Sequence, residues 1–176
     1  MNIFFKSLLL SLLLSLTSLN ARASALSSYE RQIIASCLVL EAASEGTEGM
    51  RAVLNVIHNR ADHKLSRVVR VTIKRGQFSA MHSIWGKNYV RLVLLIDTIH
   101  RIVGNPDFNA LIERAKRDRM YESALKLVLI MEKGLLEDNT RSATHYHTLA
   151  INPYWADADS FSHTVTIGNH RFYREE

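Results

Sequence analysis

Glu41 is an acidic residue that the sequence places on an apolar helix face. Ile34, Cys37 and Leu38 precede it by seven, four and three residues, the spacing of one helix face. Glu41 is therefore expected to point the way the apolar side chains point. Apolar surroundings favour the protonated form of a carboxyl group, which can then act as a general acid. Spacing alone leaves a second reading open, in which Glu41 lies in water at a frayed helix end.

The helix that carries Glu41 is predicted to begin at Ser27, because Ser27 and Glu30 have the spacing of a capping box. Gly46 and its neighbours are predicted to end it, with Thr47 as the N-cap of a second helix. The second helix has an apolar stripe, and its amides Asn55 and Asn59 either bind a sugar acetamido group or cap neighbouring loops. Two helices thus meet beside Glu41.

The rest of the chain alternates helical and strand-like patterns. Apolar periodicity predicts helices over 66–73, 89–103, 107–116 and 119–133. Residues 143–147 are typical of a polar-aromatic strand, and 164–167 and 170–173 flank Gly168-Asn169, the Gly-first pair of a type II′ hairpin. We predict an α+β, mainly α-helical fold with a small C-terminal β-hairpin, in a single domain over 24–176.

Residues 1–23 have the features of a secretory signal peptide. Lys6 supplies a positive start, an apolar Leu/Ser run follows, and Ala21-Arg22-Ala23 is a small-residue cleavage signal. We expect cleavage after Ala23, with Ala23-Ser24-Ala25 as the second choice and an uncleaved anchor as the alternative. The mature protein is expected to be periplasmic or secreted, without stable membrane insertion.

Charge and cysteine content narrow the class of partner. The formal net charge is +5, and removing Lys6 and Arg22 leaves 20 basic residues against 17 acidic ones. A modest positive charge on an exported protein suits an anionic cell-wall polymer at least as well as nucleic acid. Cys37 is the sole cysteine, so no intrachain disulfide can form, and we expect it to be a small buried hydrophobe.

The segment around His145 and His147 raises the question of a metal. Alternate residues of a strand project to one side, so the two imidazoles have metal-ligand spacing. No second cluster completes such a site in the sequence. We therefore expect no metal and no cofactor, and assign these histidines to hydrogen bonding in a cleft or to a structural role.

Four separated motifs resemble one known family. Leu-Glu-Ala-Ala-Ser-Glu-Gly-Thr-Glu-Gly at 40–49 is similar to the Gly-Glu-Ala-Arg-Gly-Glu-x-x-x-Gly signature of the SleB-type cell-wall hydrolases, and the helix after it is similar to that family's second helix. Gly-Gln-Phe-Ser at 76–79, Ala-Thr-His-Tyr-His at 143–147 and Ile-Gly-Asn-His-Arg-Phe-Tyr at 167–173 follow in the same order.

This resemblance implies a lysozyme-like domain that cleaves the β-1,4 bond between N-acetylmuramic acid and N-acetylglucosamine in peptidoglycan. Its single catalytic glutamate falls on Glu41, although Leu40 and Ala43 replace the usual Gly and Arg beside it. The family motifs make Gln77, Ser79, Tyr146 and His147 the candidates for substrate binding. The expected partner is the peptidoglycan glycan strand and not nucleic acid, and we expect a monomer.

Three further interpretations stay open. Cleavage by water instead of transglycosylation would call for a base such as Glu45 or Glu48, which the sequence otherwise places as first-turn or capping acids. A metal-dependent amidase or peptidase would use His145 and His147. In a non-catalytic wall-binding module, Glu41 would be structural.

Overall fold

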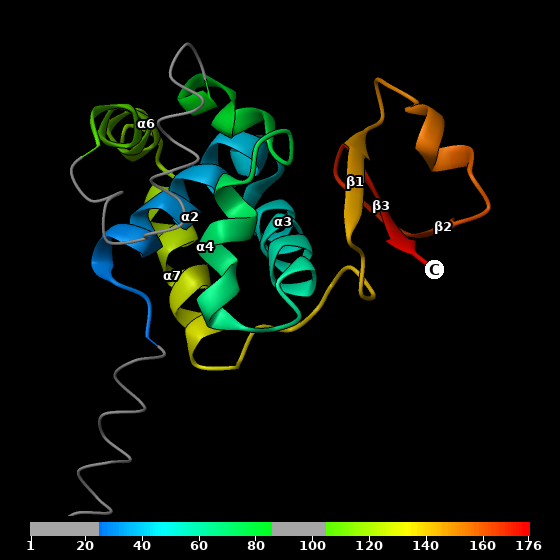
Figure 1. Ribbon diagram of the computed structural model, residues 1–176, viewed down its shortest axis with the longest axis horizontal. Helices are drawn as coiled ribbons and strands as arrows, with labels where there is room; N and C mark the ends of the chain where they lie inside the picture. Colours follow the sequence, from blue (N-terminus) through cyan, green and yellow to red (C-terminus); the bar gives the residue numbers. More distant parts are fainter. Residues whose placement is uncertain (1–24, 86–104) are drawn as a thin grey trace, which may run out of the picture.

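The computed structural model describes residues 25–85 and 105–176 (Figure 1). The predicted signal peptide and the predicted helix over 89–103 lie outside the described residues. The α-helices are α2 (Ser28–Ala42), α3 (Gly46–Arg60), α4 (Leu65–Ile73), α6 (Pro106–Lys116) and α7 (Tyr121–Glu132). The 3-10 helices are η1 (Ala43–Glu45), η2 (Ser79–Trp85) and η4 (Tyr154–Asp157), and the strands are β1 (His145–Thr148), β2 (Phe161–Ile167) and β3 (His170–Glu175). The predicted mainly helical α+β fold is confirmed.

Helix α2 lies at the centre of the helical body. It packs against α3, α4, α6 and α7, which surround it in Figure 1. The predicted inward residues Ile34, Cys37 and Leu38 are fully buried. Burying each large apolar side chain contributes about 1.5–3 kcal/mol, so this face fixes α2 in the core. Burial also raises the pKa of the Cys37 thiol well above its usual value, which keeps it an uncharged core residue, as predicted.

The start of α2 confirms the predicted capping box. The Ser27 hydroxyl accepts a hydrogen bond from the Glu30 amide at 3.2 Å, and the Ser27 amide donates to the Glu30 carboxylate at 2.6 Å. The next helix, α3, is present as predicted, but Thr47 is not its N-cap. Helix α3 begins at Gly46, and Thr47 lies inside its first turn. The reason is that η1 runs directly into α3, so the chain turns at the positive φ of Gly46 (70°) without a side-chain cap.

The three strands form one antiparallel sheet in the order β1-β3-β2. The predicted hairpin is β2 and β3, joined at Gly168, whose φ of 54° fits the Gly-first turn. Strand β1 adds the third strand along β3, pairing Thr148 with His170. Phe172 on this sheet packs with Ala52 and Val56 of α3 and with Ala143. The sheet therefore lies against the α3 side of the helical body, as Figure 1 shows.

No helix among the described residues is long and apolar enough to cross a membrane.

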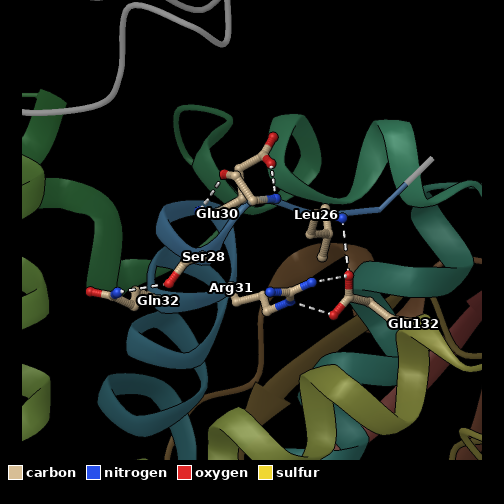
Figure 2. A network of polar contacts seen from close by, with 7 residues as sticks. Leu26, Ser28, Glu30, Arg31, Gln32 and Glu132 are labelled. Atoms are coloured by element: carbon tan, nitrogen blue, oxygen red, sulfur yellow. Dashed lines mark hydrogen bonds and ion pairs between the residues drawn. The ribbon is translucent and has the colours of Figure 1, made fainter. Parts of the chain in front are cut away.

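An ion pair ties the beginning of α2 to the end of α7 (Figure 2). Arg31 donates to both carboxylate oxygens of Glu132, at 2.6 and 3.1 Å, and the Leu26 amide donates to the same carboxylate at 3.0 Å. The Glu132 side chain is only 10% exposed, whereas that of Arg31 is 30% exposed. Removing either partner of a pair so enclosed would leave the other charge unpaired, which destabilises the fold.

Replacing Glu132 by alanine is expected to lower the free energy of unfolding by about 2 kcal/mol, since Arg31 and the Leu26 amide both lose their partner. Denaturant unfolding followed by circular dichroism measures the change. Glu113→Ala is the control, because its pair with Lys116 is solvent-exposed and should change stability by less than about 0.5 kcal/mol. Equal midpoints for the two variants would contradict the expectation.

Candidate active site

Glu41 lies in the last turn of α2, where two distant segments reach its carboxylate. The Ser79 hydroxyl donates to Oε1 at 2.8 Å, and the Ala80 amide donates to the same oxygen at 2.5 Å. The Tyr146 hydroxyl donates to Oε2 at 2.7 Å. The carboxylate is thus held by η2 on one side and by β1 on the other, which fixes its orientation.

Arg60, at the end of α3, positions both of these segments. Its Nε donates to the Thr144 carbonyl at 2.5 Å, two residues before Tyr146. Its Nη1 donates to the Gln77 side-chain oxygen at 2.8 Å, and the guanidinium lies 5.6 Å from the centre of the Phe78 ring. Burial lowers the pKa of Arg60 from its usual value. One side chain therefore clamps together the loop before η2 and the strand that carries Tyr146.

Tyr146 is packed so that its hydroxyl remains a donor. Its ring lies against Phe172 at 5.5 Å, Phe78 at 6.5 Å and His170 at 5.2 Å between ring centres. Burial, with the nearby negative charge of Glu41, raises the pKa of Tyr146 well above its usual value. The phenol therefore keeps its proton and directs it at Glu41 Oε2.

The pattern of donors indicates which oxygen of Glu41 can carry a proton. Oε1 faces the Ala80 amide, which can only donate, so this oxygen must remain an acceptor. Oε2 faces a single hydroxyl, that of Tyr146, and a hydroxyl can either donate or accept. A proton on Oε2 is thus compatible with the site when the Tyr146 hydroxyl changes from donor to acceptor. The arrangement suits a carboxyl group that gives up and takes back a proton at one defined atom.

A cleft of about 500 Å³ opens beside Glu41. One wall comes from the end of α2 and η1, and the other comes from the end of β1 and the β2–β3 turn. Its lining residues are Glu41, Ser44, Glu45, Thr148, Leu149, Ala150, Asn169 and His170. The cleft therefore lies at the junction of the helical body and the sheet.

Glu45 joins the two walls. Its Oε2 accepts the Asn169 amide at 2.9 Å, and its Oε1 accepts the Asn169 side-chain amide at 3.3 Å. The hydrogen bond from the Asn169 backbone lowers the pKa of Glu45, against a smaller opposing effect of desolvation. Its carboxylate therefore serves the turn of the hairpin and does not cap α3. Glu48 lies in the first turn of α3, pairs with Arg51 at 3.3 Å and does not line the cleft.

Residues 44–173 match the protein-family model described as Cell Wall Hydrolase. The chain belongs to the cell wall hydrolase family. This confirms the SleB-type resemblance and makes the protein an enzyme of peptidoglycan degradation, whose substrate lies outside the cytoplasm. The matched range begins three residues after Glu41 and includes every other predicted site residue. Searches of curated proteins and of solved structures found no match.

The four residues predicted to bind substrate in this cell wall hydrolase fall in different places. Ser79 and Tyr146 contact Glu41 directly. Gln77 is hydrogen-bonded to Arg60, and both residues line a second hollow of about 440 Å³. His147 is buried, with its ring stacked 5.3 Å from that of Tyr173 and its Nδ1 bonded to the Thr148 carbonyl at 2.8 Å.

The other polar groups singled out from the sequence have structural partners. Asn55 donates to the Glu137 carbonyl at 3.0 Å and Asn59 to the Ala143 carbonyl at 2.9 Å, so both amides hold loops. The His145 ring contacts Trp155 and Phe161. Within residues 25–85 and 105–176, no group of three or more His, Cys, Asp or Glu side chains gathers as a metal-ligand set.

Two cleft residues, Asn169 and His170, were not among the residues predicted from the sequence. Both belong to the last of the family motifs, which indicated a hairpin but no chemistry. The signal that could have found them is the Gly-first turn itself. A tight turn places the residues after its glycine at the end of the sheet, where a neighbouring wall can bind them.

Replacing Tyr146 by phenylalanine is expected to lower kcat about tenfold and to leave KM nearly unchanged. The phenyl ring keeps the packing on Phe78 and Phe172, but Glu41 loses one charge-assisted hydrogen bond, worth about 1.5–3 kcal/mol. Initial rates of solubilisation of purified peptidoglycan measure both constants. Tyr121→Phe in α7 is the matched control, since it removes a buried hydroxyl outside the cleft. A higher KM with an unaltered kcat would contradict the role of Tyr146 as an orienting group.

Proposed function

We propose that this cell wall hydrolase is a lytic transglycosylase that cleaves the β-1,4 bond between N-acetylmuramic acid and N-acetylglucosamine. Glu41 serves as its single general acid and base. The observation that supports this most is the pattern of donors around Glu41, which leaves Oε2 as the proton-carrying atom at the edge of a cleft. Glu45, the other acidic residue of that cleft, is occupied by Asn169.

The reaction needs one carboxyl group that acts twice. Protonated Glu41 gives its proton to the glycosidic oxygen as the bond from C1 of the muramic acid to that oxygen breaks. The resulting carboxylate then takes the proton of the C6 hydroxyl on the same sugar, and the C6 oxygen bonds to C1. The product is a 1,6-anhydro sugar, and Glu41 regains its proton. The substrate's own acetamido group stabilises the positive charge that develops at C1.

The signal peptide, the single domain, the monomeric state and the location outside the cytoplasm are proposed from the sequence. Residues 1–23 act as a signal peptide, and residues 24–176 form one catalytic domain that works as a monomer in the periplasm or outside the cell. Ser79 and Tyr146 hold the acid at the bond to be cleaved. Gln77 is proposed to serve a neighbouring part of the glycan-binding surface from the hollow beside Arg60, and His147 is proposed to support that surface from inside, through its bonds to Thr148 and Tyr173.

Mass spectrometry of muropeptides released from purified peptidoglycan tests this reaction. We expect fragments that end in 1,6-anhydro-muramic acid, each lighter by one water than the hydrolytic product. Fragments with reducing ends would instead show attack by water, and freed stem peptides with intact glycan would show an amidase or peptidase. Either of these results would overturn the proposal.

A further inference from the structure

His170 is a buried polar residue whose imidazole has no hydrogen-bond partner in the part of the chain that the structure describes. It is the first residue of β3, it is only 6% exposed, and its ring lies edge-on to that of Tyr146. The other histidines of the sheet use ring nitrogens in hydrogen bonds, as His147 does with Tyr173 and His163 with Thr166. No such bond is formed by His170 within residues 25–85 and 105–176.

The unpaired imidazole belongs to the wall of the Glu41 cleft. Buried polar groups in folded proteins are normally hydrogen-bonded, and an exception calls for an explanation. Among the described residues, only the Tyr121 hydroxyl is a fully buried side-chain nitrogen or oxygen that lacks a hydrogen-bond partner. The ring nitrogens of His170 also lack a partner, so they are not fully buried. The small exposed part of His170 therefore includes its ring nitrogens, and a molecule in the cleft can reach them.

The backbone around His170 is fixed from two directions. The carboxylate of Glu45 accepts hydrogen bonds from the backbone amide and the side-chain amide of Asn169, the residue before His170. On the other side, the Leu149 amide donates to the Asn169 carbonyl at 2.8 Å, and Thr148 pairs with His170 in the sheet. A binding group held in advance loses little conformational freedom when its ligand arrives.

Burial lowers the pKa of His170 below its usual value, although the charges of Glu45 and Glu41 oppose this shift. The imidazole is thus neutral near pH 7, with one nitrogen that donates and one that accepts. A sugar hydroxyl or an acetamido group offers the complementary donor and acceptor. A carboxylate or phosphate would meet the negative charges of Glu41 and Glu45 in the same cleft, which disfavours an anionic ligand.

We propose that His170 is a substrate-binding residue that hydrogen-bonds a hydroxyl or acetamido group of the glycan strand in the Glu41 cleft. This inference rests on the proposed function for the identity of the glycan. In this proposal, His170 is the residue beside the β2–β3 turn that faces the ligand. The hydrogen bonds between Glu45 and Asn169 hold His170 in place.

The test measures binding in a variant that does not cleave its ligand. Isothermal titration with purified, soluble peptidoglycan glycan strands compares Glu41→Gln with the double variants that add His170→Ala or His170→Gln. We expect alanine to weaken binding about tenfold and glutamine, whose amide both donates and accepts, to restore part of the loss. His163→Ala on β2 is the matched control, because that residue bonds Thr166 and lies outside the cleft.

A second measurement keeps the native histidine, so it does not depend on how the variants fold. In the ¹⁵N spectrum of the Glu41→Gln protein, addition of glycan strands should shift the ring nitrogens of His170 and leave those of His163 in place. Equal affinity of the alanine variant, or an unchanged His170 signal at saturating glycan, would overturn the inference. If Glu41→Gln retains full cleavage activity, the proposed mechanism fails, and the ¹⁵N result still reports on His170 alone.

Discussion

Replacing Glu41 by glutamine is expected to lower glycan cleavage by a factor of about 10²–10⁴, the usual contribution of a general acid–base group. The amide oxygen can still accept the hydrogen bonds of Ser79 and Ala80, and the amide nitrogen can donate to the Tyr146 hydroxyl. The site should therefore keep its shape, and the variant loses only the group that we propose gives and takes the proton. Release of saccharides from purified peptidoglycan, quantified by chromatography, measures the loss.

Glu48→Gln is the matched control for this experiment. It makes the same chemical change seven residues further along the chain, on a side chain that is largely exposed and outside the cleft. Its activity should stay within a factor of two of the unaltered enzyme. Unfolding midpoints of both variants should match that of the parent protein. Undiminished saccharide release by Glu41→Gln would remove Glu41 from the mechanism.

Replacing Gly49 by alanine is expected to lower the free energy of unfolding by about 3 kcal/mol. Alanine within a helix normally stabilises it by about 1 kcal/mol relative to glycine. At Gly49, however, an added Cβ would lie 2.2 Å from the Cβ of Glu45. A Cβ cannot move without its backbone, so the first turn of α3 must shift away from η1, and overpacking of this kind is costly. Denaturant unfolding measures the change.

A double-mutant cycle identifies the cause. In the background of Glu45→Gly, which removes the opposing Cβ, Gly49→Ala should cost little or even stabilise the protein. Gly134→Ala is the second control, because its positive φ of 67° is unfavourable for alanine while its surroundings are open. It should cost about 1 kcal/mol. A stabilising effect of Gly49→Ala in the parent protein would show that α3 moves freely and that Glu45 is not fixed as described.

Glu45 also explains why a glycine follows β2 in the hairpin turn. An added Cβ at Gly168 would lie 1.9 Å from Glu45 Oε2. Two glycines, one in α3 and one in the β2–β3 turn, thus leave room for the side chain of Glu45. The sequence predicted Glu45 to be a first-turn or capping acid, whereas in the structure its carboxylate links the helical body to the sheet.

The amino-acid sequence by itself predicted the features that depend on near neighbours. The capping box of Ser27 and Glu30, the buried face that includes Ile34 and Leu38, and the hairpin at Gly168 each arise from residues only a few positions apart. Local backbone preferences and the burial of one helix face determine such features. The helix-face spacing and the family resemblance together made Glu41 the candidate catalytic residue.

The tertiary structure decided which groups meet Glu41 and what they do. Ser79 and Tyr146 are separated from it by 38 and 105 residues, and Asn169 is separated from Glu45 by 124. Sequence spacing carries no information about such contacts, because they depend on how Arg60 and the core bring η2 and β1 to the end of α2. For the same reason, the sequence could not predict that His147 turns inward while His170 faces the cleft.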